Sequence, residues 1–138
     1  MLRYTFRKEE RLTHRREIES LFTGAKAYKD YPFLLLVRSV PLADAPVKVV
    51  ISVSKRRIRR AHDRNRVKRL IREAWRHEKG ALYDVLSTHN RTLHAAWVFT
   101  GNTVVQTPLT AQKIRALTRR LKEDIANLTL PETPSEQA

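Results

Sequence analysis

The chain has 138 residues, of which 28 are Lys or Arg and 14 are Asp or Glu, so its formal net charge is +14 at pH 7. It contains no cysteine, which excludes disulfides and thiolate metal sites and favours a reducing compartment. A chain of this length fits one domain with a modest core. The excess of cations favours a polyanionic partner, either a nucleic acid or an anionic membrane surface.

The two ends of the chain carry little pattern. Residues 1–12 are polar and predict a flexible segment, residues 13–130 predict one domain, and the acidic residues 131–138 predict a disordered tail. No stretch has the roughly 18 apolar residues that cross a bilayer. The charged residues 1–8 precede no apolar run, unlike a secretory signal. We therefore expect a cytoplasmic protein.

The first predicted element is a short helix with Thr13 as its N-cap, because a threonine hydroxyl can accept a backbone N–H of the first turn. Ile18, Leu21 and Phe22 fall on one face of this helix, and Gly24 marks its C-terminal end.

Two strands are predicted next. Residues 33–40 form a continuous apolar run after Pro32, which predicts a strand covered on both faces. Residues 47–54 are rich in β-branched side chains, which favour strands. Because the link between the two runs is short, we expect the strands to pair as a hairpin.

A basic loop at residues 55–61 leads into the next helix, which is predicted to start at His62 or Asp63 and to end near His77. Asp63 is favourable near the positive N-terminal end of a helix. Gly80 is expected to interrupt the helical pattern.

The last third of the chain predicts a short helix around residues 82–86, a strand at 95–100, and a helix whose N-terminus is Thr107–Pro108. The apolar stripe of that helix comprises Ile114, Leu117, Leu121, Ile125 and Leu128. The resulting order is αββαβα. We therefore expect an α+β protein, a single small α/β sandwich whose three- to four-stranded sheet is covered by helices.

Charge is concentrated in residues 54–79, which hold twelve basic and three acidic residues and so carry +9 of the net +14. Helical spacing divides the segment into an apolar and a cationic face. The apolar face, predicted to pack on the sheet, comprises Val67, Leu70, Ile71, Ala74 and Trp75. The cationic face comprises Asn65, Lys68, Arg69, Arg72 and Arg76, with Arg66 at its flank and Arg64 at the helix start. Like charges one turn apart repel, and a polyphosphate partner would remove that repulsion, so nucleic-acid binding is favoured over a merely solvated face.

Residues 52–76 resemble the signature of the bacterial ribonuclease P protein component. Residues 52–55 are similar to its Ser-Val-Ser-Lys strand end, 64–66 to its Arg-Asn-Arg element, and 68–74 to its Lys-Arg-Leu-Ile-Arg-Glu-Ala run. A weaker likeness covers residues 9–125. The resemblance implies a left-handed crossover between strands around the basic helix, whereas the general expectation for such a connection is right-handed.

The resemblance also implies a function, as a subunit of the ribonucleoprotein that removes the 5′ leader of precursor tRNA by endonucleolytic cleavage. In that family the RNA holds the active site and its Mg²⁺, so no catalytic residue, metal site or cofactor is expected on this chain. The residues expected to bind the catalytic RNA are Arg64, Asn65, Arg66, Lys68, Arg69, Arg72 and Arg76. The residues expected at the leader groove, between the first helix and the sheet, are Phe22, Phe33 and Lys55, with Arg56 and Arg57 nearby.

The chain departs from the family's pattern at the groove. Ile18 stands where a second aromatic residue is common, and an aromatic residue is also common near Leu36. An aromatic ring can stack on a leader base with little sequence preference, and Tyr31 is an alternative platform for such stacking. Ordinary core packing is an equal alternative for Phe22 and Phe33.

Two other functions remain open, and two more are disfavoured. A ribosomal or other structural RNA-binding protein would share the charge and the fold class. A DNA-binding protein would place the basic helix in a major groove, but only Asn65 on its outward face suits the reading of bases. A membrane-surface helix is disfavoured because Leu70 and Trp75 are needed inside. A protein enzyme acting alone is disfavoured as well, because the five histidines are scattered and glycine is scarce.

Overall fold

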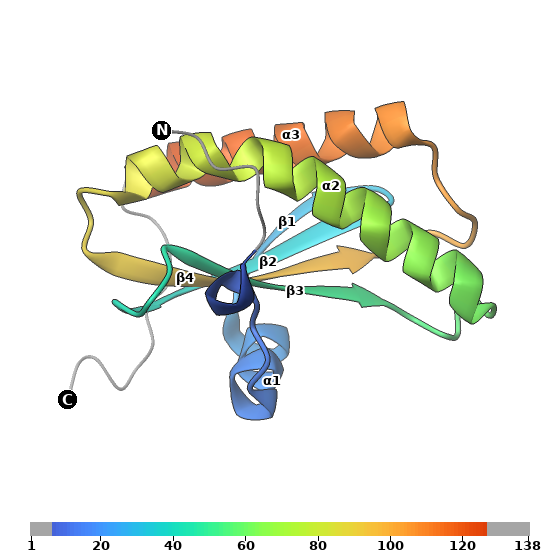
Figure 1. The fold of residues 1–138 in the computed structure, drawn as a ribbon, viewed down its shortest axis with the longest axis horizontal. Coiled ribbons are helices and arrows are strands. Elements are labelled where there is room, and N and C mark those ends of the chain that lie inside the picture. The colour runs from blue at the N-terminus through green and yellow to red at the C-terminus, as the bar shows by residue number, and fades with distance from the viewer. Residues whose placement is uncertain (1–6, 127–138) are drawn as a thin grey trace.

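In the computed structural model, which describes residues 7–126, two helices cover one face of a four-stranded sheet and a third helix lies against the other face (Figure 1). The strand order in the sheet is β1-β2-β4-β3. The elements are η1 (Lys8–Glu10), α1 (Arg15–Gly24), β1 (Lys26–Asp30), β2 (Phe33–Pro41), β3 (Val47–Val53), α2 (Ala61–Leu86), β4 (Arg91–Phe99) and α3 (Thr107–Ala126). The α+β class and the four-stranded sheet confirm the prediction, and the predicted order holds with β1 added.

The predicted hairpin between β2 and β3 is wrong, because β4 lies between these strands, antiparallel to β2 and parallel to β3. The link from β2 to β3 is held on β4 instead. The Ala43 N–H donates to Thr92 Oγ1 at 2.7 Å, and that hydroxyl donates to the Ala45 carbonyl at 2.9 Å. A short link favours a hairpin only when no third strand pairs with both partners, and the nine-residue β4 pairs along the whole of β2.

The edge strand β1 was not predicted because its sequence, Lys-Ala-Tyr-Lys-Asp, has one large apolar side chain. Tyr28 is that side chain and is 2% exposed. Its hydroxyl donates to Asp124 of α3 at 2.5 Å, and Lys26 contacts the same carboxylate. Charged residues on an edge strand also discourage pairing with another chain.

The helix α2 is longer than predicted, since it continues through Gly80 to Leu86 and includes the segment predicted as a separate short helix. A glycine inside a helix costs about 1 kcal/mol relative to alanine. Leu82 and Leu86 are 0% and 4% exposed, so burial of this last stretch outweighs that cost. α2 connects the parallel strands β3 and β4 and forms the crossover between them.

Alternation along the strands separates two cores. On β2, Phe33, Leu35 and Val37 face α2 and α3 in the larger core, whereas Leu34 and Leu36 face α1 in the smaller one. The predicted stripe of α3 lies in the larger core at Ile114, Leu117, Leu121 and Ile125, while Leu128 lies outside the described residues. The sheet is therefore covered on both faces, as the continuous apolar run of β2 indicated.

The segment before α1 is packed rather than flexible from residue 7 onward. Glu10 and Leu12 are 5% and 3% exposed, and the Leu12 N–H donates to the Val49 carbonyl of β3 at 2.9 Å. Glu10 forms a buried ion pair with Lys79 of α2 at 2.6 Å. The predicted boundary at residue 13 is thus too late, and the predicted tail at 131–138 lies outside the described residues.

The ends of the two remaining helices differ in how well they were predicted. α1 begins at Arg15 with His14 as its N-cap, so Thr13 does not cap it. α3 begins at Thr107, one residue before the predicted start at Pro108 with Thr107 as N-cap. Pro108 still lies in the first turn, where the missing N–H of proline costs nothing.

Candidate nucleic-acid interface

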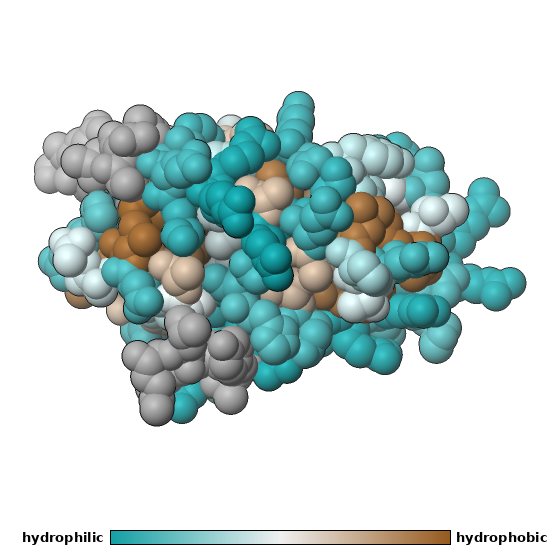
Figure 2. Space-filling view, turned by 90° about the horizontal axis from the view of Figure 1, so that it is seen from above, coloured by the Kyte–Doolittle hydropathy of each residue, from teal (hydrophilic) through white to brown (hydrophobic). Residues whose placement is uncertain are grey.

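The outward side of α2 carries a group of cations that have no acidic partner among residues 7–126. We call this group the arginine face; it consists of Arg66, Lys68, Arg69 and Arg72. Within residues 7–126, no Asp or Glu side chain forms an ion pair with any of the four. Asn65, which precedes them, is also exposed. A view from the side of α2 and α3 shows hydrophilic side chains over much of this surface (Figure 2). Unneutralised guanidinium groups on a rigid helix are suited to binding phosphates.

The C-terminal end of this cationic side is partly neutralised. Arg76 forms an ion pair with Glu73 at 2.5 Å, and His77 lies 3.2 Å from the same carboxylate. The hydrogen bond from Arg76, followed by that of His77, lowers the pKa of Glu73. The strongest positive field therefore lies in the first half of α2.

The opposite side of α2 is fixed to the sheet. Val67 and Ile71 are 0% exposed, and Trp75 packs on Trp97 of β4 with ring centroids 6.0 Å apart. Ala74 is buried too, whereas Leu70, predicted to be in the same face, is only half-buried. The helix cannot rotate without exposing this apolar side, so its cations have a fixed direction.

Arg64 has a different task from the arginine face. Its side chain is half-buried, and one guanidinium nitrogen donates to the carbonyls of Ile58 and Arg59 at 3.0 and 2.7 Å. These carbonyls belong to the basic loop between β3 and α2, and the Ile58 side chain anchors the loop at 5% exposure. Arg64 therefore positions the loop and also carries charge next to the arginine face.

The loop itself presents Lys55, Arg56 and Arg57, all exposed. Arg57 donates to the carbonyl of Thr100, directly after β4, at 2.8 Å. The three cations lie at the end of the sheet where α2 begins (Figure 1), and their role at the leader groove stays a prediction.

The two phenylalanines predicted at the leader groove lie on different faces of the sheet. Phe22 of α1 is 50% exposed and is available for contact. Phe33 is 1% exposed and packs edge-on against Phe99 in the core under α2 and α3, with ring centroids 5.6 Å apart. Since α1 lies on the other face, Phe33 does not line the predicted groove, and core packing accounts for it. The apolar side chains of the sheet that do face α1 and stay partly exposed are Leu34, Val50 and Val98.

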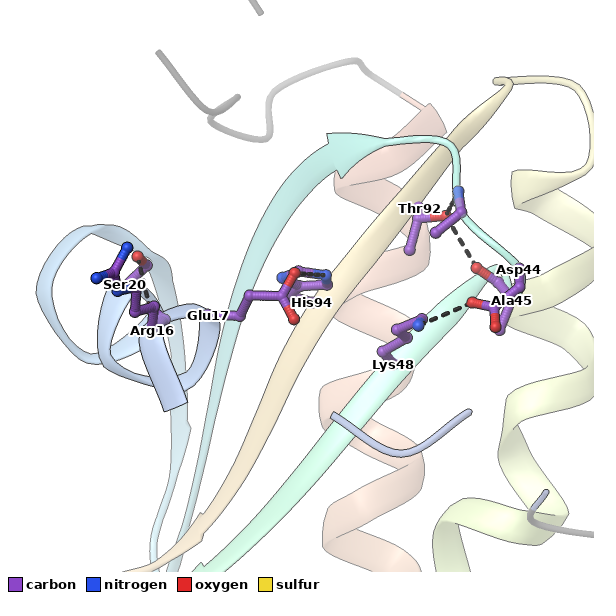
Figure 3. Close-up of polar contacts among 9 residues, drawn as sticks. Arg16, Glu17, Ser20, Asp44, Ala45, Lys48, Thr92 and His94 are labelled. Atoms are coloured by element: carbon purple, nitrogen blue, oxygen red, sulfur yellow. Dashed lines mark hydrogen bonds and ion pairs between the residues drawn. The ribbon is translucent and has the colours of Figure 1, made fainter. Parts of the chain in front are cut away.

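The α1 side of the sheet also holds a titratable cluster that sequence reasoning missed. His94 of β4 is 7% exposed, and its Nε2 lies 3.8 Å from a carboxylate oxygen of Glu17 on α1 (Figure 3). Arg38 and Lys48 are its neighbours in register on the two adjacent strands. Burial lowers the pKa of His94, and Lys48 and Arg38 lower it further against the opposing effect of Glu17. The imidazole is therefore neutral near pH 7, and strand alternation was the signal that could have grouped these residues.

Metal ligands and membrane spans were also considered. No three His, Asp or Glu side chains in the described part of the chain gather as a metal site. None of the helices within residues 7–126 is both long and apolar enough to traverse a bilayer.

Comparison with known proteins identifies the family. Residues 6–123 match the family model of ribonuclease P, which is most of the chain. The chain belongs to the ribonuclease P protein family. Among curated members, the ribonuclease P protein component of Porphyromonas gingivalis is 43% identical over 93 residues, which cover 67% of this chain and 66% of that relative. The component of Legionella pneumophila is 35% identical over 83 residues, covering 60% of this chain and 71% of that protein.

Solved ribonuclease P proteins share the fold of this chain. The Staphylococcus aureus protein aligns with a TM-score of 0.60 at 16% identity, covering 82% of this chain and 95% of the other. The Thermotoga maritima protein aligns with a TM-score of 0.50 at 23% identity, covering 87% and 94%. The mixed sheet with its three helices is thus the architecture of ribonuclease P proteins.

Proposed function

We propose that this chain is the protein subunit of ribonuclease P, which binds the catalytic RNA of that enzyme and the 5′ leader of precursor tRNA. In this role it supports endonucleolytic maturation of tRNA 5′ ends. The observation that carries the proposal is the arginine face, within a chain of the ribonuclease P family. Its cations have no acidic partner in the part of the chain that the structure describes, and a buried apolar side fixes their direction.

Contact with the catalytic RNA is assigned to α2. The residues are Arg64, Asn65, Arg66, Lys68, Arg69, Arg72 and Arg76. Each cation that neutralises a phosphate releases condensed counterions, so binding is strong at low salt and weakens as salt rises. Arginine adds a defined fork of donors that matches phosphate oxygens in a folded RNA.

Contact with the 5′ leader is assigned to the α1 side and the basic loop. Phe22 offers an exposed ring for stacking, and Lys55, Arg56 and Arg57 offer charge for the backbone. Phe33 is left out because its ring is buried on the opposite face.

As the resemblance implies, the RNA would hold the active site and its Mg²⁺, and the protein would act through charge. Protein cations next to the phosphates would reduce the repulsion between the catalytic RNA and its substrate, so less Mg²⁺ would be needed for cleavage. We place this reaction in the cytoplasm, in line with the absence of cysteine.

The test is reconstitution. The purified protein is added to the ribonuclease P RNA of the same genome, and cleavage of precursor tRNA is measured at low Mg²⁺. The native protein should restore cleavage, and the triple variant Arg66→Ala/Arg69→Ala/Arg72→Ala should not. Arg119→Ala, which removes one exposed cation from α3, is the control for charge loss away from α2 and from the leader contacts.

Two outcomes would contradict the proposal. One is cleavage that the native protein leaves unchanged at every Mg²⁺ concentration. The other is a pull-down in which the protein recovers ribosomal RNA and no ribonuclease P RNA, which would favour a ribosomal role.

A further inference from the structure

The residue that follows β4, Thr100, joins two loops that lie far apart in the sequence. Its N–H donates to the Pro32 carbonyl in the turn between β1 and β2, and its carbonyl accepts a hydrogen bond from the Arg57 guanidinium in the basic loop, both at 2.8 Å. The turn, the basic loop and the loop between β4 and α3 all lie at the end of the sheet where α2 begins (Figure 1). The position of the Thr100 carbonyl therefore decides where the Arg57 side chain is held.

Gly101, the next residue, is buried in a space that has no room for a side chain. A carbon added to it would lie 2.7 Å from the Phe99 ring and 3.1 Å from the Pro32 side chain, closer than nonbonded carbon atoms normally approach. The Phe99 ring cannot easily move aside, because it is 1% exposed and packs edge-on against Phe33. No glycine between residues 7 and 126 has a positive φ, so close approach, and not backbone conformation, is what requires glycine here.

The basic loop depends on this junction for its direction. Within the loop, the N–H groups of Arg57 and Ile58 both donate to the Ser54 carbonyl, at 3.2 and 3.0 Å, which gives the loop a local turn. The bond from Arg57 to Thr100 spans 43 positions and ties this turn to the end of β4. A guanidinium has several N–H donors, so the exposed Arg57 can hold the carbonyl through Nη1 and still contact a phosphate.

We propose that Gly101 is a positioning residue for leader binding, because its lack of a side chain places the Thr100 carbonyl where it holds Arg57. This inference rests on the proposed function, which assigns Lys55, Arg56 and Arg57 to the 5′ leader. Gly101 itself touches no RNA. A loop that is held in one direction before binding loses less conformational freedom when it contacts the leader, so its cations bind more tightly. A side chain at position 101 displaces Thr100 and releases that constraint.

The closing experiment uses Gly101→Ala in holoenzyme reconstituted with ribonuclease P RNA. Affinity is measured for precursor tRNA with a long leader and for tRNA without a leader. Gly101→Ala should weaken binding of the long-leader precursor about threefold or more, because the loop contacts leader phosphates less well, and should leave binding of leaderless tRNA unchanged. Gly24→Ala, in which the added carbon meets Arg38 at an ordinary 3.7 Å, is the matched control and should bind both RNAs as the native protein does. Equal weakening for the two RNAs would overturn the inference.

A double-variant cycle separates positioning from a general loss of structure. In an Arg57→Ala background, Gly101→Ala should cause no further loss of affinity for the long-leader precursor, because the hydrogen bond through which Gly101 acts is already gone. A further loss as large as that in the native background would show that Gly101 does not act through Arg57, and the inference would fail.

A second pair of variants keeps the question open to test if Gly101→Ala does not fold. Arg56→Ala should cost less leader affinity in the Arg57→Ala background than in the native protein, because the loop that presents Arg56 has then lost its bond to Thr100. Strictly additive effects of the two substitutions would show that this bond does not position the loop, and would overturn the inference.

Failure of the proposed function gives a different result. A native protein that does not activate the RNA contradicts the proposed function as a whole. A native holoenzyme that binds long-leader and leaderless tRNA equally contradicts the assignment of the basic loop to the leader, and the role of Gly101 with it. A native preference for the leader that Gly101→Ala keeps in full overturns only the positioning role of Gly101.

Discussion

At the scale of single residues, the cations of this protein have separate tasks. Arg57 and Arg64 donate to backbone carbonyls and shape the basic loop, and Arg76 pairs with a carboxylate. Arg66 and Arg69 do none of these and point outward from α2. A surface cation that has no acidic partner within the protein adds little to the free energy of unfolding, and it is repelled by neighbouring cations on the same helix. Such cations are the ones most directly committed to a partner.

This distinction gives the first prediction. Arg69→Ala should weaken binding of ribonuclease P RNA and lower the slope of log affinity against log salt by about one unit, because one phosphate contact is lost. The free energy of unfolding should change by less than about 0.5 kcal/mol. Affinity measured across a salt series checks the slope, with Arg119→Ala on α3 as the charge-matched control. An unaltered slope for Arg69→Ala would remove this residue from the interface.

The second prediction at this scale concerns His94. Its pKa in the folded protein is lowered, chiefly by burial, below the ordinary value of 6.5. As the pH falls below about 6.5, the His94 imidazole takes up a proton in the unfolded chain but not in the folded protein. The free energy of unfolding therefore declines below about pH 6.5 and keeps its full value above it. Arg38 and Lys48 on the adjacent strands act in the same direction, and Glu17 on α1 opposes them.

Denaturant unfolding between pH 7.5 and pH 5.5 measures this effect. The native protein should lose stability with a slope of at most about 1.4 kcal/mol per pH unit, the limit for one proton, and His94→Gln should lose less. Carboxyl groups such as Glu10, whose pKa is lowered from 4.5, lose their contribution only at lower pH. Parallel slopes for the two proteins in this window would show that His94 does not titrate abnormally.

Helical spacing in the sequence correctly predicted which side of α2 is cationic. It could not predict which arginines bond to the protein's own backbone and which remain exposed. Helical spacing gives direction, whereas the bonds of Arg64 depend on where the loop folds back. Phe33 shows the same limit on a strand, because an apolar run covered on both faces does not say which face its odd-numbered residues take. Glu17 and His94 lie 77 positions apart in sequence, and only the sheet brings them together.

At the scale of elements, the buried pair of Glu10 and Lys79 attaches the first segment of the chain to α2. Lys79 is 0% exposed, and Tyr83 donates to the same carboxylate at 2.6 Å. Burial raises the pKa of Glu10, but hydrogen bonds from Lys79 and Tyr83 outweigh it, so the carboxyl stays ionised. The attachment explains why residues 7–12 are ordered despite their polar sequence.

Removing the carboxylate should therefore be costly. Glu10→Ala is expected to lower the free energy of unfolding by about 3–5 kcal/mol, because the ammonium of Lys79 loses its buried counter-charge. Tyr83→Phe, which removes one hydrogen bond from the same carboxylate, should cost only about 1–2 kcal/mol. Equilibrium denaturation of the three proteins checks the order. Equal stability of Glu10→Ala and the native protein would show that the pair contributes nothing.

The attachment of α2 to the sheet gives another test. Ile71 is 0% exposed beneath the arginine face, so Ile71→Ala should lower stability by about 2–5 kcal/mol through lost burial and a cavity. RNA affinity of the remaining folded protein should be nearly native, since no cation changes. Leu70→Ala should lower the free energy of unfolding by less, because Leu70 is only half-buried. Helical periodicity alone placed Ile71 and Leu70 in the same face.

At the scale of the whole molecule, the two proposed contact regions lie on helices that cover opposite faces of the sheet. The arginine face lies on α2 on one side of the sheet, and Phe22 lies on α1 on the other (Figure 1). The class, the helices and three of the four strands, β2, β3 and β4, followed from the pattern of apolar residues in the sequence. The insertion of β4 between β2 and β3 did not, because strand order depends on pairing between segments more than 40 residues apart.

This separation predicts additive effects. Arg69→Ala should weaken holoenzyme assembly whatever the substrate, whereas Phe22→Ala should weaken binding only of tRNA with a leader, by about 1–3 kcal/mol if one base stacks there. Since the two side chains share no partner and lie on opposite faces of the sheet, the free-energy effects on precursor binding should add within about 0.5 kcal/mol in the double variant. Binding of long-leader and leaderless tRNA to the four holoenzymes gives the comparison. A coupling free energy well above about 0.5 kcal/mol would mean that one RNA molecule passes around the edge of the sheet and contacts both helices.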